Sequence, residues 1–251
     1  MKRFVAFIII GCSLGVLWYF SYKSASNSSD ENILVVGTNA EYPPFTYVEN
    51  DTIIGFDIDL INEVAIRIGK KIIIKDMPFD VLIPEVQRGT ISVIAAGLTP
   101  TPEKKKEVLF SECYFDGDPL VIISSGAKPL KTIESLTGKD VVVNEGYTAD
   151  FYMSAIKGPV IKRFPAPAAS FLALQSGRAD AYVAARSTVK PFFKQYGTDQ
   201  FSVAEIPGTE EKYALAISPR DGDLVGKINS VINEMQKDGT IEQLKNKWDL
   251  K

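Results

Sequence analysis

The chain has 251 residues, of which 45% are hydrophobic and 24% are charged, the balance of an ordinary globular protein. Its formal net charge is only −3 and its basic residues are scattered, so we expect no nucleic-acid partner, because phosphate backbones are held by concentrated positive charge. The chain contains no histidine, which argues against catalytic triads and ordinary zinc sites, and we expect neither a metal nor a cofactor.

The first residues have the pattern of an export signal. Lys2 and Arg3 precede an apolar run over residues 4–20, and a Ser-rich stretch over residues 21–29 follows. Positive charge before an apolar segment is typical of a signal peptide or membrane anchor, and a Ser-rich stretch is typical of a flexible tether. We therefore expect residues 1–32 to be a signal or anchor segment with a tether. The folded part would then lie on the periplasmic or extracellular side of the inner membrane, with the cell surface as the alternative location.

Cys12 leaves three fates open for this segment. Residues 9–12 resemble a bacterial lipoprotein processing site, at which Cys12 would be lipidated after cleavage. The residues after Cys12 stay apolar, which favours an uncleaved anchor instead, and plain cleavage is the third alternative. The only other cysteine is Cys113, so we expect no internal disulfide.

From residue 33 onward, β-branched runs alternate with apolar residues at helical spacing, a pattern that predicts mostly parallel sheets covered by helices. A short internal repeat favours two such units over one large continuous sheet, since residues 86–96 and 174–184 both have the pattern of a helix end, a glycine and a strand. In the first half we expect strands at residues 33–36, 72–74 and 91–96 and helices at 58–68 and 81–86. In the second half we expect strands at residues 140–144, 160–164 and 181–184 and helices at 148–156 and 170–175.

Five spaced motifs carry a family resemblance. They are GTNAEYPPF at residues 37–45, GFDIDL at 55–60, FDVLIP at 79–84, LTPTPEK at 98–104 and KDGT at 237–240. With them, residues 33–248 resemble the polar amino-acid-binding proteins of ABC importers, which have the type II periplasmic binding fold. Within that family the chain is most similar to arginine-binding members.

The resemblance implies an α/β fold of two lobes, each a mostly parallel sheet flanked by helices, joined by a two-stranded hinge. Lobe 1 would be discontinuous, with residues 33–117 plus 213–251, and lobe 2 would comprise residues 118–212. The chain would cross between the lobes near residues 116–119 and 208–213. Bending at such crossings lets binding proteins close around a ligand.

The α-carboxylate of an amino acid needs a fixed cation, and Lys104 stands where the family usually has arginine. Thr101 is a good N-cap, so we expect a helix whose positive end favours an anion and whose first turn contains Lys104. A lysine cannot form the two parallel bonds of an arginine. Either Lys104 acts as a point charge, or the amides of Gly97, Thr99 and Thr148 do more of the work. Alternatively, Lys104 belongs to a solvated basic face.

The α-ammonium lacks the anchor that the family commonly provides. An aspartate usually follows the strand equivalent to residues 181–184, and this chain has Ala185 there. Glu145, Glu41 and the carbonyl of Gly97 remain as alternative partners.

The ligand side chain would lie between aromatic rings. Tyr42 and Phe79 occupy positions where the family stacks flat groups, and a planar guanidinium suits such a slot, with about 0.5 to 2 kcal/mol per cation–π contact. Asn39 and Glu41 would add polar contacts, although core packing and a surface position are the alternative readings for the rings and for Glu41. Asp57 is interpreted as a helix N-cap. The full predicted ligand-binding set is Asn39, Glu41, Tyr42, Phe79, Ala96, Gly97, Leu98, Thr99, Lys104, Glu145, Thr148 and Ala185.

The resemblance thus implies an extracytoplasmic solute-binding protein that captures a polar, cationic amino acid, with arginine favoured, and delivers it to an ABC transporter permease. We expect a monomer that catalyses no reaction and is tethered to the membrane by its N-terminus. One alternative is an extracellular dehydratase or lyase on the same fold, with Glu41 or Glu145 as its acid or base. Another is a surface adhesin or ligand trap that works without a permease.

Overall fold

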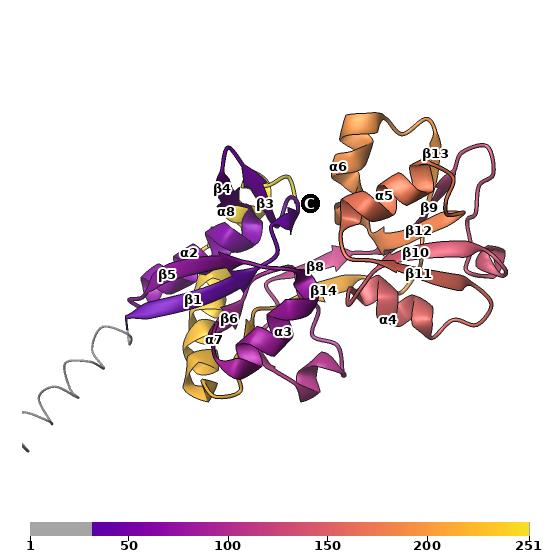
Figure 1. The fold of residues 1–251 in the computed structure, drawn as a ribbon. Helices are drawn as coiled ribbons and strands as arrows, with labels where there is room; N and C mark the ends of the chain where they lie inside the picture. Colours follow the sequence, from indigo (N-terminus) through magenta and orange to yellow (C-terminus); the bar gives the residue numbers. More distant parts are fainter. Residues whose placement is uncertain (1–31, 251) are drawn as a thin grey trace, which may run out of the picture.

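A computed structural model describes residues 32–250, which form two lobes side by side, connected by a narrow pair of strands (Figure 1). The predicted export segment, with Cys12 and most of the tether, lies outside the described residues. Among the helices of residues 32–250, none combines the length and the apolar composition that crossing a membrane requires.

The first lobe is built on a five-stranded sheet in the order β5-β1-β6-β15-β7. β1 pairs in parallel with β5 and β6, whereas β15 is antiparallel to both β6 and β7. The strands are β1 (Ile33–Thr38), β5 (Lys71–Asp76), β6 (Val93–Ile94), β7 (Leu109–Phe110) and β15 (Ala216–Ile217).

Helices cover both faces of this sheet and supply its core. α2 buries Leu60, Ile61 and Val64 at helical spacing, and these residues share one apolar cluster with Ile228 and Ile232 of α7. The helices are α2 (Phe56–Arg67), α3 (Phe79–Arg88), α7 (Gly222–Lys237) and α8 (Thr240–Lys247). A short antiparallel meander of β2 (Glu41–Tyr42), β3 (Thr46–Glu49) and β4 (Thr52–Ile54) is attached to this lobe.

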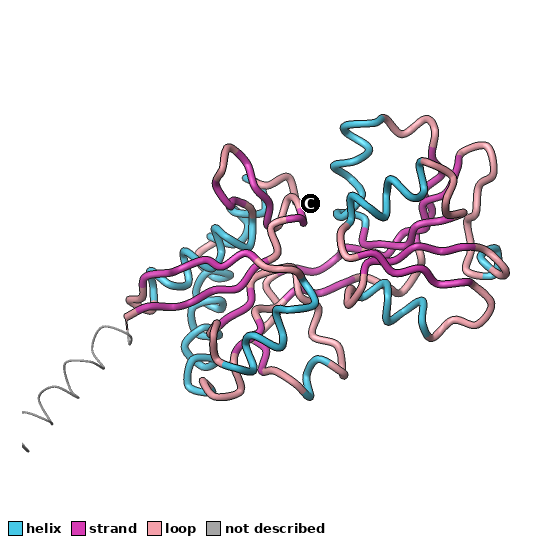
Figure 2. The backbone as a smooth tube through the Cα atoms, in the orientation of Figure 1, coloured by secondary structure: helices cyan, strands magenta, loops and turns pink. Residues whose placement is uncertain are grey.

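The second lobe repeats the plan with the strand order β11-β10-β12-β9-β13. In Figure 2, the strands of this lobe lie between helices, as in the first lobe. β10 is parallel to β11 and β12, and β9 is antiparallel to β12 and β13. The strands are β9 (Leu120–Ser125), β10 (Asp140–Asn144), β11 (Val160–Phe164), β12 (Ala181–Ala185) and β13 (Phe201–Glu205). The helices are α4 (Thr148–Ser154), α5 (Pro167–Gln175) and α6 (Arg186–Tyr196).

Two strands join the lobes. β8 (Phe115–Asp118) pairs antiparallel with β14 (Glu211–Tyr213). At the first-lobe end of this pair, Phe115 and Tyr213 stack with ring centroids 5.5 Å apart, and Phe45 meets the Tyr213 ring edge to face at 4.9 Å. This aromatic packing anchors the hinge in the core of the first lobe.

The predicted α/β fold of two lobes is confirmed, and the single continuous sheet is wrong because the two five-stranded sheets are separate. One local prediction is also wrong: the helix expected after Thr101 is only the 3₁₀ turn η1 (Lys104–Lys106). Glu103, not Thr101, is the N-cap of this turn, although the Thr101 hydroxyl accepts a bond from the Lys104 amide at 3.3 Å. So short a turn has little dipole with which to attract an anion.

Candidate functional site

The candidate site lies where the two lobes touch beside the hinge. The Tyr147 hydroxyl of the second lobe donates to Asn39 Oδ1 of the first lobe at 3.2 Å. The Tyr42 hydroxyl lies 2.9 Å from Ser187 Oγ across the same gap. The loops involved follow β1, β6, β10 and β12, the position at which ligands bind in open parallel sheets.

Lys104 is buried in this gap, with 3% of its surface exposed, whereas Lys105 and Lys106 are exposed. Its Nζ lies 5.5 Å from the ring centroids of both Phe79 and Phe151, which belong to different lobes. Burial lowers the pKa of Lys104 to about 8, against an opposing effect of the negative charge of Glu211. The solvated basic face is therefore the wrong reading for Lys104.

The loop after β6 is shaped by Gly97 and Asp57. Gly97 has φ 57°, and a Cβ there would lie 2.5 Å from Tyr42 Cε1, so only glycine fits. Its amide donates to Asp57 Oδ2 at 2.5 Å, which means that this amide is not available to hold a ligand carboxylate.

The predicted N-cap role of Asp57 is wrong. Gly55 is the N-cap of α2, and Asp57 lies inside the first turn with no capping bond from its side chain. Besides the Gly97 amide, its carboxylate accepts a bond from the Tyr114 hydroxyl at 2.9 Å. Burial raises the pKa of Asp57 to about 7. Its role is thus to hold the loop beside the site.

Three aromatic rings meet in the gap. Tyr42 and Tyr147 meet edge to face with centroids 6.2 Å apart, and Phe79 and Tyr147 are 4.3 Å apart. Tyr42 also packs against Phe45 at 5.1 Å, so it belongs to the core of the first lobe as well as to the gap. Sequence reasoning did not include Tyr147 in the site, although it lies between the predicted residues Glu145 and Thr148.

Glu211 of the hinge strand β14 is the second residue that sequence reasoning missed. It is 7% exposed, its Oε1 accepts a bond from Thr99 Oγ1 at 3.1 Å, and its Oε2 accepts one from the Tyr213 hydroxyl at 3.0 Å. The Thr148 side chain also hydrogen-bonds to it. Burial raises the pKa of Glu211 to about 7, against an opposing effect of the hydrogen bond from Thr148. An acidic residue inside the predicted crossing at residues 208–213 was the available clue.

The remaining predicted residues divide into two groups. Glu41 and Glu145 are exposed, and Glu41 is close enough to Tyr147 to help burial raise the pKa of that phenol. Three side chains pack in the apolar cores and present no polar group to the gap. These are Ala96 and Leu98 in the first lobe and Ala185 in the second lobe.

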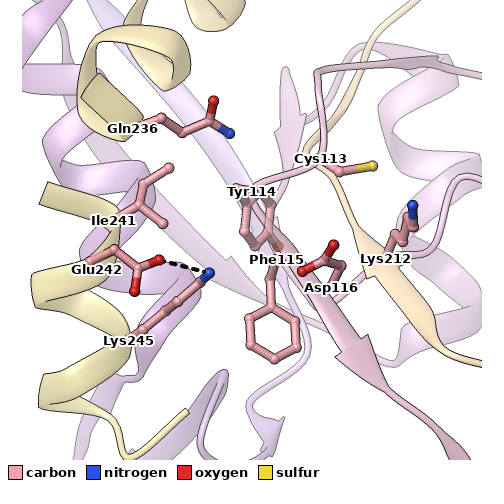
Figure 3. A pocket seen from close by; sticks show the side chains of 9 residues that line it. All are labelled: Cys113, Tyr114, Phe115, Asp116, Lys212, Gln236, Ile241, Glu242 and Lys245. Carbon is pink, nitrogen blue, oxygen red and sulfur yellow. Dashed lines mark hydrogen bonds and ion pairs between the residues drawn. The ribbon is translucent and has the colours of Figure 1, made fainter. Parts of the chain in front are cut away.

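A cavity of about 400 Å³ lies elsewhere, between the hinge strands and α8 (Figure 3). The residues on its hinge side include Cys113, Asp116 and Lys212. On the helix side it is lined by Glu242 and Lys245, which form an ion pair with 2.9 Å between Oε1 and Nζ. None of the predicted ligand-binding residues contributes to this cavity.

Known proteins match the chain over most of its length. Residues 34–251 match the model of the bacterial extracellular solute-binding proteins, family 3. The arginine-binding extracellular protein ArtP of Bacillus subtilis (strain 168) is 29% identical over 251 residues, which cover 99% of this chain and 98% of ArtP.

Solved structures agree with that match. An ancestral arginine-binding protein was solved bound to arginine, at 36% identity, TM-score 0.81, and coverage of 86% of this chain and 98% of the other. An ancestral arginine-binding protein was also solved bound to glutamine, at 35% identity, TM-score 0.81, and coverage of 88% of this chain and 99% of the other. AncCDT-1, an ancestral amino acid-binding protein and precursor of cyclohexadienyl dehydratase, is similar at 29% identity, TM-score 0.79, and coverage of 90% and 99%. The resemblance inferred from the motifs is confirmed, and the chain belongs to the bacterial extracellular solute-binding proteins of family 3.

Proposed function

We propose that the chain is the amino-acid-binding component of an ABC importer, that arginine is its preferred ligand, and that it passes the ligand to a permease without chemical change. The family membership and the arginine-binding relatives support this function. The export signal supports a position outside the cytoplasmic membrane, with residues 1–32 as the tether and Cys12 as the site of lipidation if the segment is cleaved there.

One observation carries the proposal: the gap beside the hinge contains a buried cation, a buried carboxylate and three aromatic rings. Lys104 supplies the positive charge that an α-carboxylate needs. The rings of Tyr42, Phe79 and Tyr147 suit a flat, weakly hydrated guanidinium, and Glu41 lies at the exposed edge where such a cation would emerge.

The proposed contacts are sufficient for a useful affinity. A micromolar dissociation constant corresponds to about −8 kcal/mol, which must remain after ordering costs are met. Charge-assisted bonds contribute about 1.5 to 3 kcal/mol each, and a cation over a ring about 0.5 to 2 kcal/mol. Bonds to both ends of the zwitterion and to the guanidinium, together with stacking, reach that level.

The test is titration calorimetry of the purified chain against the common amino acids. We expect arginine to bind most tightly, lysine and ornithine more weakly, and glutamate not at all. Glutamine is the critical comparison, because one similar ancestral arginine-binding structure has arginine bound and another has glutamine bound. Equal affinity for glutamine and arginine would remove the case for a cation-selective site.

A catalytic function on the same fold makes a different prediction. Glu41 and Glu145, the acid–base candidates named from the sequence, are exposed, whereas general acids and bases act best when the site around them excludes water. Incubation of the chain with each ligand that it binds, followed by mass spectrometry, should return the ligand unchanged. Conversion of any of these ligands into a product would show that the function is catalysis rather than binding alone.

A further inference from the structure

We propose that Glu211, in the hinge strand, is the residue that holds the α-ammonium of the ligand, in place of an anchor after β12. The inference rests on the proposed function, since it concerns the same gap between the lobes. It assigns a binding role to a residue of the hinge itself.

The position after β12 cannot serve. Ala185 is 6% exposed and packs in the apolar core of the second lobe. Arg186, which follows it, is exposed and forms an ion pair with Glu205 on the surface. The lobe therefore offers no carboxylate at the end of this strand.

Glu211 stands where three parts of the site converge. Thr99 comes from the loop after β6 in the first lobe, and its hydroxyl donates to Glu211 Oε1. Thr148 begins α4 in the second lobe and also hydrogen-bonds to the carboxylate. Tyr213 belongs to the hinge and shares its single hydroxyl hydrogen between Glu211 Oε2 at 3.0 Å and Asp118 Oδ2 at 2.7 Å. A cation bound to Glu211 would thus contact both lobes and the strand that joins them.

The carboxylate of Glu211 has neutral hydrogen-bond donors but no ion-pair partner. Among the described residues, no lysine or arginine nitrogen lies within 4.0 Å of its oxygens. Removing a carboxylate from water is unfavourable unless a positive charge compensates it, and hydroxyl donors compensate only in part. An incoming ammonium would supply the missing charge.

Asp118 is the other buried carboxylate of the hinge, and its hydrogen-bonding capacity is already used. Its Oδ1 accepts a bond from the Ser187 amide at 3.0 Å. Its Oδ2 accepts bonds from Ser187 Oγ, from the Tyr213 hydroxyl at 2.7 Å and from the Tyr42 hydroxyl at 3.3 Å. Asp118 therefore fastens the two lobes together, and Glu211 remains as the buried anion that can accept a ligand.

Lys104 and Glu211 together match a zwitterion. Lys104 is buried, no carboxylate of the described residues lies within 4.0 Å of its Nζ, and the Nζ lies 5.5 Å from the centroids of the two aromatic rings. The charges of Lys104 and Glu211 influence each other but do not form a direct ion pair. An α-amino acid placed between them gives each buried charge an opposite partner.

The test compares arginine with deamino-arginine, which keeps the carboxylate and the guanidinium but has hydrogen in place of the α-ammonium. In the unaltered full chain, arginine should bind about 10- to 100-fold more tightly, the contribution of a charge-assisted bond. In Glu211→Gln, which keeps the shape and removes the charge, the two ligands should bind with similar affinity. Glu210→Gln, at the exposed carboxylate one residue before Glu211, is the matched control and should keep the full ratio.

The outcomes separate the two proposals. If the unaltered chain binds neither ligand, the proposed function fails and the inference fails with it. If it binds arginine and Glu211→Gln keeps the full ratio, only the inference is overturned. Should Glu211→Gln not fold, as judged by circular dichroism, the ratio is measured in the unaltered chain at pH 5 and pH 8. Protonation of Glu211 should collapse the ratio at the lower pH, and an unchanged ratio would refute the assignment.

Discussion

Two buried charges dominate the site at the scale of single residues. Lys104 could be selected from the sequence because it lies in a family motif, but its burial depends on Phe79 and Phe151, which are distant in the chain and come from opposite lobes. The sequence places Glu211 in the predicted crossing at residues 208–213, but no periodicity indicates which side chains of the short strands β8 and β14 face the ligand. Residue type and motif thus predict the candidates, and only the fold shows which are buried together.

Neutralising Lys104 tests its role with the carboxylate that all amino acids share. We expect Lys104→Gln to weaken the binding of every ligand amino acid by a similar factor, about 10- to 100-fold, through loss of a charge-assisted bond. Calorimetry with arginine and lysine measures the factor. Lys105→Gln, one residue along and exposed, should bind as the unaltered chain does. A loss confined to arginine would instead place Lys104 beside the ligand side chain.

The binding of arginine should depend on pH with an optimum between about 7 and about 8. Glu211 has a pKa raised to about 7, so at lower pH it is protonated and offers no charge to the ammonium. The affinity therefore rises as the pH increases through about 7. Lys104 has a pKa lowered to about 8, so above that pH it loses the charge that holds the carboxylate, and the affinity falls. Dissociation constants measured from pH 5 to pH 10 test this, and a flat profile would exclude both groups from the site.

At the scale of elements, the strands and helices with strong local patterns were predictable. β10 and β11 have the predicted bounds: three valines form the centre of β10, and β11 begins with Val160 and Ile161. The C-cap of α3 is Gly89, whose φ of 81° suits that position. The helix predicted after Thr101 is shortened to a single 3₁₀ turn, because the chain must enter β7 at Leu109. Tertiary pairing therefore overrode the local helix signal.

The loop after β6 gives a prediction at this scale. In Gly97→Ala the new methyl group would lie 2.5 Å from the Tyr42 ring, and the residue would have to keep φ 57° or release its bond to Asp57. We expect a loss of about 1 to 3 kcal/mol in the free energy of unfolding. Arginine binding should weaken as well, because Tyr42 must move. Chemical denaturation measures the loss, and Gly177→Ala, at a positive φ with open space around it, separates backbone strain from the steric clash.

At the scale of the whole molecule, two sheets of the same topology face each other across a hinge of two short strands. The gap between them is bridged by hydrogen bonds of Tyr42 to Ser187 and of Tyr147 to Asn39. These two bonds join neutral side chains and are worth about 0.5 to 1.5 kcal/mol each. The carboxylate of Asp118 and an exposed ion pair of Lys190 with Asp249 at 3.3 Å also connect the lobes. The internal repeat in the sequence predicted the two units. Their contact depends on individual side chains that are not part of the repeat.

A crystal structure of the chain grown with arginine tests most directly whether a zwitterion is held between the lobes. We predict one arginine beside the hinge, with its carboxylate at Lys104, its ammonium at Glu211 and its guanidinium against the rings of Tyr42, Phe79 and Tyr147. Arginine located in the cavity behind the hinge, or a gap with no arginine while the lobes remain closed, would contradict that arrangement.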